Sequence, residues 1–422
     1  MTHRTMTGHA PEDSQNRAPI GFVEFVALIA ALMALTALGI DSMLPALPAI
    51  ADALDVAEPN RRQFVITAFM VGFAFAMLVY GPMTDRFGRR RVLVVALVGY
   101  VATNLLAAIS GSFDLLLIAR LASGAMVAGA RTVTVALVRD CFSGRAMARV
   151  MSLAFIVFMA APVLAPTFGQ LILLFASWRW IFGGIALVTA CILAWFVLRM
   201  PETLAIEDRR PLRLGLLVAG TKRVAGDRYA VGYTLAATML QGALFGFIGS
   251  IQQIVFDVFR VPHLLAVVFA SVAGTMAVGS FLNSRIVMKL GTRLISHTAL
   301  IGFIIFAVAH LMISLSGAET LANFIVVQAL MMACFGLATS NFSAMAMENM
   351  GDIAGTAASL QGFVATLGAA LIGAYVGQSY DGTTVPLYVG FTTMGVLALV
   401  IVLVAERGRL FRPAHEPAAR RA

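Results

Sequence analysis

Apolar runs of about 20 residues recur along the whole chain, and they limit what it can fold into. Each run is long enough to cross a hydrocarbon core of roughly 30 Å as a helix. Hydrophobic residues fill 60% of the 422 positions and charged residues 12%. That charged share is about half of what keeps a soluble domain in water. The chain is therefore predicted to be an all-α membrane protein, because a helix satisfies its own backbone polar groups inside a bilayer.

One long hydrophilic connector divides the predicted spans six and six. A tail at 1–19 precedes a first bundle at 20–198, and the connector at 199–229 leads to a second bundle at 230–405 and a tail at 406–422. The twelve spans are expected at 20–43, 64–83, 92–112, 115–137, 151–175, 179–198, 230–254, 263–284, 294–315, 321–346, 357–378 and 387–405.

The distribution of Lys and Arg predicts the orientation of these spans. Basic residues concentrate in the two tails and in the loops on the same side, and few of them, such as Arg61, Arg62 and Arg260, lie in the opposite loops. Basic loops stay on the cytoplasmic side of a membrane, so both termini are expected in the cytoplasm. The preference for Ala and Arg over Lys favours a bacterial source, and hence the inner (cytoplasmic) membrane, for this multi-pass protein.

Several functional classes are not expected. The net charge of +9 resides in short loops rather than in a basic domain, so no nucleic-acid partner is predicted. Cys141, Cys191 and Cys334 are scattered, which argues against a disulfide framework and a metal site. No nucleophile and base share a common depth, so no enzyme and no cofactor is expected. The expected partners are a small-molecule substrate, protons and the lipid bilayer, with the protein acting as a monomer.

The two halves of the chain resemble each other at one turn. Phe87-Gly88-Arg89-Arg90, between the second and third spans, has the same character as Leu290-Gly291-Thr292-Arg293, between the eighth and ninth. A basic turn at equivalent places in two six-helix halves is typical of parallel repeats in transporters. The pattern favours a transporter in which two bundles rock against each other.

The segment from Gly81 to Val92 is the most specific motif. Gly81 allows close approach of helices, and Asp85 can pair with a cation or with a helix N-terminus. Gly88 permits a tight turn, and the arginines can anchor at an anionic membrane face. A merely basic turn is the alternative. The predicted gating loop comprises Gly81, Asp85, Arg86, Gly88, Arg89 and Arg90.

The fourth span carries two intramembrane arginines on one stripe. At about 100° per residue, Arg120 and Arg131 lie almost in line. Exposing a guanidinium to lipid near the middle of the bilayer costs roughly 3 kcal/mol or more, so the stripe is expected to face protein or water. Arg120 could instead be a structural tie between helices, and Arg131 could snorkel or pair with a loop. The stripe comprises Arg120, Ser123, Gly124, Val127, Arg131 and Thr134.

Asp41, near the end of the first span, is the predicted proton-accepting carboxylate. Its depth matches that of Arg120, and a buried carboxylate near a movable cation changes protonation with conformation. A simple helix-end role before Pro45 is the alternative. Glu24 is the second carboxylate considered, although an interfacial position suits it better.

The fifth span contains Pro162, Pro166 and Gly169. The prolines remove backbone donors and loosen the helix, and Gly169 permits close packing on the same face. An ordinary kinked helix is the alternative. Further polar residues could line an adaptable, mostly apolar cavity, whereas His310 is expected to be a packing histidine. The possible cavity residues are Ser123, Gly124, Arg131, Gln241, Asn283, Gln328, Asn341 and Gln361.

The segment Gly81–Val92 resembles the loop signature of the major facilitator superfamily. With 41–48, 161–169 and 354–360, the chain is similar to the Bcr/CflA branch of drug:proton antiporters over nearly its whole length. The resemblance implies a major facilitator fold of two pseudo-symmetric bundles, and a fifth span that favours exchange. Ser123, Gln170 and Arg131 depart from the pattern of the branch.

The combined interpretation is a proton-coupled efflux antiporter that exports amphipathic drugs or toxic compounds and confers antibiotic resistance. An exporter of a specific metabolite or sugar on the same scaffold is the main alternative. A membrane-embedded enzyme lacks a candidate site, and a structural or receptor protein would not need the cationic stripe.

Overall fold

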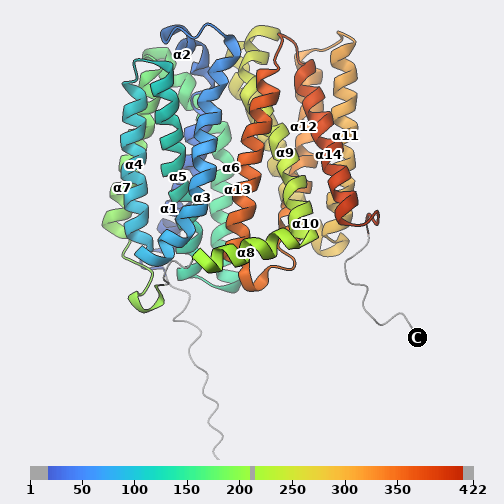
Figure 1. The fold of residues 1–422 in the computed structure, drawn as a ribbon. Coiled ribbons are helices and arrows are strands. Elements are labelled where there is room, and N and C mark those ends of the chain that lie inside the picture. Colours follow the sequence, from blue (N-terminus) through green and yellow to red (C-terminus); the bar gives the residue numbers. More distant parts are fainter. Residues whose placement is uncertain (1–17, 210–213, 412–422) are drawn as a thin grey trace, which may run out of the picture.

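The computed structural model describes residues 18–209 and 214–411, and within these ranges it is helical, with no strand (Figure 1). The first six long helices are α1 (Phe22–Asp41), α3 (Phe64–Phe87), α4 (Arg89–Ala108), α5 (Phe113–Cys141), α6 (Gly144–Phe175) and α7 (Arg179–Arg199). The second six are α9 (Arg228–Gln253), α10 (Leu265–Leu290), α11 (Thr292–Leu315), α12 (Leu321–Ala346), α13 (Ala354–Gln378) and α14 (Val385–Ala405).

The predicted all-α membrane fold is confirmed. Eleven helices in the described ranges have the length and hydropathy of a membrane span, and the 32-residue α6 completes the twelve. The start of α1 and the end of α14 lie at the bottom of Figure 1, which we name the terminus end. The short α2 (Leu47–Ala53) lies at the opposite end, which we name the far end.

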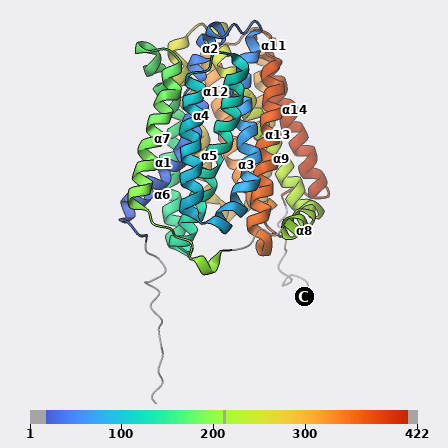
Figure 2. The same cartoon turned by 60° about the vertical axis from the view of Figure 1, so that its left-hand side comes forward.

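The connector between the bundles differs from the prediction, because it contains a helix. This helix, α8 (Leu214–Gly226), runs across the terminus end, roughly perpendicular to the spans (Figures 1 and 2). It packs against the start of α13, where a Cβ on Gly220 would come within 2.9 Å of Thr356 Cγ2. Its 13 residues are too few to cross a bilayer, so a search for spans passes over it.

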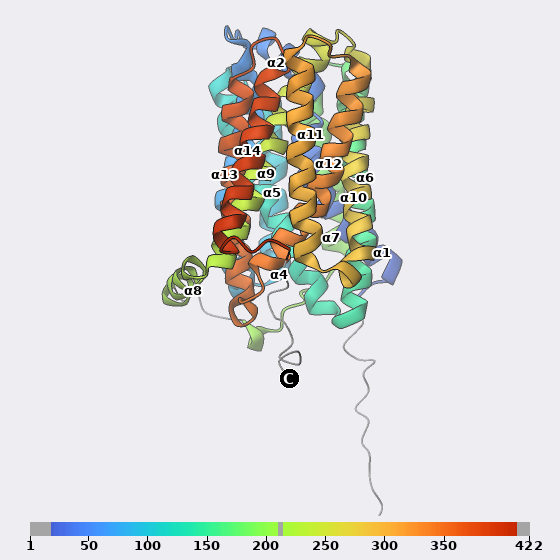
Figure 3. The same cartoon turned by 90° about the vertical axis from the view of Figure 1, so that its right-hand side faces the viewer.

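Equivalent glycines bring helices together in each bundle. In the first bundle, α3 crosses α5 so closely that a Cβ on Gly72 would meet Leu121 O at 1.9 Å. In the second, a Cβ on Gly279 of α10 would meet Ala333 O of α12 at 2.3 Å. Such close backbone approach requires glycine. Two seams then join the bundles, α3 with α13 and α6 with α10, the latter visible in Figure 3.

Candidate functional site

A network of amide hydrogen bonds joins the two bundles at the far end. Gln63 donates to Gln253 Oε1 and, at 3.0 Å, to the carbonyl oxygen of Gly377. Asn60 donates to the carbonyl oxygen of Gln378 at 3.0 Å and accepts from Gln253 Nε2 at 2.8 Å. We name these five residues the far-end clasp. Its members come from both bundles, so it holds the far end closed.

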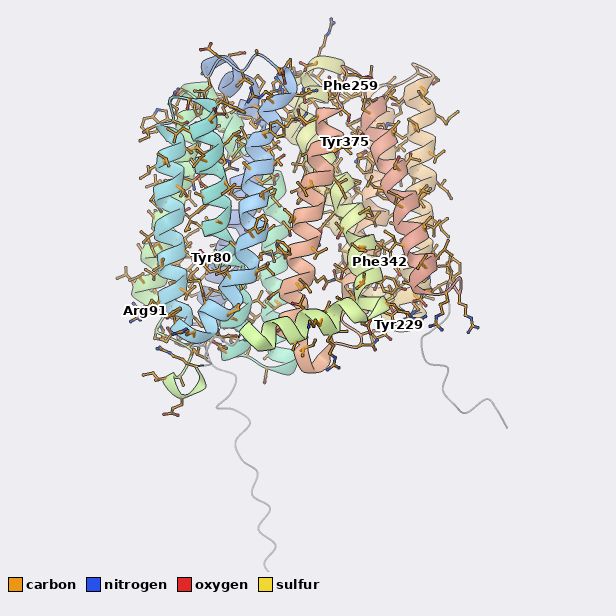
Figure 4. The ribbon with its side chains drawn as sticks, in the orientation of Figure 1. Tyr80, Arg91, Tyr229, Phe259, Phe342 and Tyr375 are labelled. Carbon is orange, nitrogen blue, oxygen red and sulfur yellow. The ribbon has the colours of Figure 1, made fainter. Side chains whose placement is uncertain are left out.

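Further contacts extend this closure. Arg62 forms an ion pair with Asp257 at 3.4 Å, and Gln170 of α6 donates to the Pro262 carbonyl at 3.3 Å. Figure 4 shows Phe259 and Tyr375 at this end of the molecule. The seam of α3 with α9 and α13 keeps a cavity of about 10 Å³, room for a single water.

Arg120 is fully buried inside the first bundle. Its Nη2 donates to the Gly39 carbonyl of α1 at 2.7 Å, and its Nε to the Val65 carbonyl of α3 at 3.3 Å. The guanidinium also lies over the rings of Phe69 and Phe182, at 4.3 and 5.7 Å from their centroids. Carbonyl dipoles and aromatic faces thus surround the cation, while Nη1 keeps no partner in the described residues.

Asp41 does not pair with Arg120 in this structure. Its side chain is 5% exposed, and its Oδ1 has no hydrogen-bond partner among the described residues. Because Asp41 lies two residues beyond Gly39, about 200° around α1, its side chain points away from Arg120. That side faces α6, where Gly169 adjoins the Ser42 carbonyl. The two charges share a depth but occupy opposite faces of α1.

The remaining stripe residues differ in exposure. Ser123 is fully buried, and its hydroxyl has no partner in the described part of the chain. Arg131 is exposed although its neighbours on the stripe, Val127 and Thr134, are fully buried. The stripe therefore holds one enclosed and one accessible guanidinium.

In α6, Gly169 is a packing residue, as predicted. A Cβ there would lie 1.8 Å from the Ser42 carbonyl oxygen and 3.0 Å from Pro45. Pro166 is buried on the same helix, whereas the side chain of Pro162 lies outside the described residues. The helix continues through both prolines, and Gly169 brings its outer half against the turn that follows Asp41.

At the terminus end, Arg89 connects α3, α4 and α5. Its guanidinium pairs with Asp85 at 2.6 Å and with Asp140 at 2.9 Å, and its side chain is 3% exposed. The carboxylate of Glu202 accepts from the backbone nitrogens of Arg89 and Arg90 at 2.8 and 3.2 Å. An anion at a helix N-terminus stabilises the helix, so this gating loop ties helix ends together.

The glycines and remaining arginines of this loop have separate contacts. Gly88 adopts φ +93°, and a Cβ there would come within 2.3 Å of Glu202 Oε2, so both conformation and space require glycine. Gly81 lies against α13, since its Cβ would meet Ser359 Oγ at 3.4 Å. Arg90 donates to the Val197 carbonyl at 2.8 Å, and Arg86 lies over the Phe87 ring.

The second bundle carries an equivalent cluster. Gly291 adopts φ +81°, and Arg293 pairs with Glu348 at 3.0 Å and with Glu406 at 2.7 Å. Tyr233 also donates to Glu406. Figure 4 shows Tyr229, whose ring lies 5.4 Å below the Arg293 guanidinium, at this end. Each bundle thus follows a positive-φ glycine with an arginine that binds two carboxylates.

Four predicted cavity residues are packing residues instead. Gly124 lies against the Phe69 carbonyl, with a Cβ distance of 1.8 Å. Asn283 and Asn341 bind each other between α10 and α12, the shorter bond being 2.7 Å. Gln328 is fully buried and accepts from Tyr388 at 3.2 Å inside the second bundle. The partners of the two asparagines and of Gln328 Oε1 come from neighbouring helices, which a single helical wheel does not reveal. Gln241 and Gln361 are half-buried.

Glu24 takes part in an ion pair at the terminus end. Its carboxylate accepts two hydrogen bonds from Arg199, at 2.7 and 2.9 Å, and one from Trp195 at 3.1 Å. The residue therefore joins α1 to α7 at the end of the bundle. This geometry fits the interfacial alternative better than a role in proton coupling.

A polar cluster near the far end of the second bundle was not predicted. His310, fully buried, binds Glu319 at 3.0 Å and stacks on Tyr388 with ring centroids 3.7 Å apart. Thr384 also donates to Glu319. Burial would raise the pKa of the Glu319 carboxyl, but hydrogen bonds from His310, Thr384 and Ser314 outweigh it and lower the pKa. The histidine and the glutamate are nine residues apart across a helix end, a spacing without a sequence signature.

Twelve spans in two bundles, clasped at one end and carrying buried polar groups inside, define a membrane transporter rather than an enzyme. The family model of the Major Facilitator Superfamily matches residues 29–373. The chain belongs to this superfamily, so the predicted family is confirmed.

Similar proteins extend over most of the chain. The bicyclomycin resistance protein homolog of Haemophilus influenzae is 32% identical over 379 residues, 86% of this chain and 90% of that protein. The multidrug resistance protein MdtL of Salmonella paratyphi A is 26% identical over 376 residues, 86% of this chain and 91% of that one. The crystal structure of the human organic anion transporter MFSD10 has a TM-score of 0.67 at 20% identity, covering 92% of this chain and 100% of that chain.

Proposed function

We propose that the protein exports small amphipathic compounds, drugs among them, in exchange for protons. The far-end clasp carries this proposal. Its bonds are between neutral amides and backbone carbonyls, each worth about 1 kcal/mol net. Such bonds can break and re-form in every cycle as the two bundles rock. The drug-resistance names of two similar proteins support an export function.

The proposed coupling group is Asp41. It is buried against α6 with one carboxylate oxygen unpartnered, so a change in its surroundings alters whether it holds a proton. Arg120, at the same depth on the opposite face of α1, is the proposed counter-charge. Rotation of α1 within the first bundle would alternately bring the carboxylate toward the guanidinium or enclose it against α6.

The gating loop is proposed to govern the conformational cycle, at a terminus end that we place in the cytoplasm. The Arg89 cluster ties the ends of α3, α4 and α5, and Gly81 lies against α13 of the other bundle. Movement of α3 against α13 would therefore form or break the ion pairs of Arg89. The inner membrane of a bacterium is the proposed location.

Cargo class can be tested in cells that lack intrinsic pumps. Expression of the protein should lower susceptibility to several cationic, neutral or zwitterionic amphipathic antimicrobials. Protection against none of the panel, with transport of a single metabolite or sugar in vesicles, would instead establish the alternative exporter on this scaffold.

The role of Asp41 can be tested through proton release. Cargo added to detergent-solubilised wild-type protein in weak buffer should release protons, and the Asp41→Asn variant should bind cargo without releasing them. The matched control is Asp52→Asn, since Asp52 lies on α2 and is exposed. Wild-type release from the Asp41→Asn variant would place coupling elsewhere, with Glu24 the next residue to test.

Orientation can be tested with single cysteines in a variant lacking Cys141, Cys191 and Cys334. Glu207→Cys lies in an exposed segment at the terminus end, and Ala318→Cys in an exposed far-end loop. A membrane-impermeant maleimide should label only the Ala318→Cys protein in intact cells, and both in permeabilised cells. The reverse pattern in intact cells would invert the proposed topology.

A further inference from the structure

Gln252 lies beside the far-end clasp, and the contacts of α9 show which way it faces. At about 100° per residue, Tyr233 and Phe247 lie on the side that packs inside the second bundle, against Phe342 and Phe269. Gln253, about 200° from Tyr233, reaches Gln63, which directly precedes α3 of the first bundle. Gln252 lies midway between these two sides.

The rest of the circumference of α9 is occupied by other helices. Gly246 packs against Val376 of α13, and Gly232 packs against Ala405 of α14. Both contacts are on the side of α9 away from Gln252, and Gly373 of α13 reaches round as far as Phe245. Gln252 therefore lies on the strip of α9 between its contact with α12 at Tyr233 and its contacts with α13 and the first bundle at Phe245 and Gln253.

The Gln252 side chain is buried and unpaired. It is 1% exposed, and neither Oε1 nor Nε2 has a hydrogen-bond partner among the described residues. Its neighbour Gln253 both accepts from Gln63 and donates to Asn60. A buried amide without partners is unfavourable, so a side chain held in this way is poised to bind a ligand.

We propose that Gln252 binds a carboxamide or lactam group of the cargo through two hydrogen bonds, an inference that rests on the proposed export function. A side-chain amide presents one acceptor and one donor side by side. An amide ligand matches both. A carboxylate or an ester can only accept, and an ammonium can only donate, so each leaves one Gln252 atom unpaired.

Apolar side chains near Gln252 on α9 could contact the apolar body of such a ligand. Phe245 and Ile248 lie within about 40° of Gln252 around α9 and are half-buried. Phe245 also lines the cavity of about 10 Å³ together with Gln63 and Met70. A cargo molecule is far larger than this cavity, so its binding requires α9 to separate from α3. That separation breaks the bond between Gln63 and Gln253, which couples cargo binding to opening of the clasp.

Four probes that share a naphthalene body test the proposal: 2-naphthamide, methyl 2-naphthoate, the 2-naphthoate anion and 2-naphthylmethylammonium. Calorimetric titration of the purified, full-length wild-type protein should show at least tenfold tighter binding of the amide than of the other three. Gln252→Leu should abolish this preference. Gln328→Leu is the matched control, because Gln328 is equally buried with an unpaired Nε2 but lies inside the second bundle.

Gln252→Glu provides a second variant in case the leucine variant fails to fold. Its carboxylate should shift the preference from the amide to the ammonium probe. An unchanged amide preference in either folded variant would contradict the proposal, and so would a wild-type protein that binds none of the probes. Amide binding that depends on Gln252, without protection of pump-deficient cells, would contradict export but support the amide site.

Discussion

The outer halves of the two bundles bury different polar groups at the same count of residues from the far-end start of a helix. The eighth residue of α5 is Arg120 and the eighth residue of α12 is Gln328, and both are fully buried. Arg120 is bound by carbonyls of α1 and α3. Gln328 is bound by Tyr388, whose ring stacks on His310. The first bundle thus buries a permanent cation there, and the second buries a neutral amide.

This difference suggests separate roles for the bundles. In the first bundle the cation is attached to the backbones of spanning helices, near a carboxyl group that is free to change partners. In the second, the polar cluster extends to Glu319 and Thr384 outside the spans, so it fixes the far-end loops to the helices. We infer that coupling resides in the first bundle and that the cluster of the second is structural.

The largest expected effect comes from removing the buried cation. Arg120→Leu should reduce proton-driven export by at least tenfold, because Asp41 loses its counter-charge, whereas Gln328→Leu should reduce export less than threefold. Export rates in inverted vesicles would measure both. The Asp41→Asn, Arg120→Ala double variant should lose much less than the sum of the single variants. Equal losses from Arg120→Leu and Gln328→Leu would remove the proposed division between the bundles.

An intermediate effect is expected at the gating loop. Asp85→Asn should slow transport several-fold and leave cargo affinity within a few-fold of wild type, because Asp85 binds Arg89 far from Gln252. The comparison is Glu348→Gln, which weakens the equivalent Arg293 cluster. Turnover and equilibrium binding should be measured separately. A large loss of affinity with normal turnover would contradict a role in the conformational cycle.

The smallest effect is expected at Glu319 and depends on pH. Its pKa is lowered in the folded protein because hydrogen bonds from His310, Thr384 and Ser314 outweigh burial. The ionised carboxylate therefore stabilises the fold above its unfolded pKa of about 4.3. This contribution is lost as the pH falls through the lower folded pKa. Thermal unfolding of wild type and Glu319→Gln should differ by a few degrees at pH 7 and converge below pH 4. A constant difference across this range would contradict the assignment.

The sequence predicted the spans well because the bilayer imposes one length and one polarity on all of them. The predicted 321–346 coincides with α12, and 64–83 falls short of α3 because the helix continues into the polar Asp85 turn. The helix α8 was missed because it is short and lies along the surface. A high mean hydropathy identifies helices that cross the lipid core, so it does not identify a helix that lies across the end of the molecule.

The site was predicted less completely, because pairing between helices is not visible in a single chain. The stripe on the fourth span correctly indicated that Arg120 avoids lipid, yet its partners are backbone carbonyls that no side-chain pattern reveals. Asn283 and Asn341 were predicted as possible cavity residues, but in the structure α10 packs on α12 and the two amides bind each other. Gln252 had no distinguishing feature in the sequence. Its proposed role follows from the absence of hydrogen-bond partners for its amide among the described residues, which only the structure shows.

The far-end clasp has a consequence for how closure of the far end depends on salt. With the terminus end in the cytoplasm, this end faces the opposite side of the inner membrane, where ionic strength can vary. Attraction between exposed charges weakens as salt increases, and the Arg62–Asp257 pair beside the clasp joins a mostly buried guanidinium to an exposed carboxylate. Bonds between uncharged amides are nearly indifferent to salt. The contribution of the clasp to closing the far end should then be the same in dilute water as in brine.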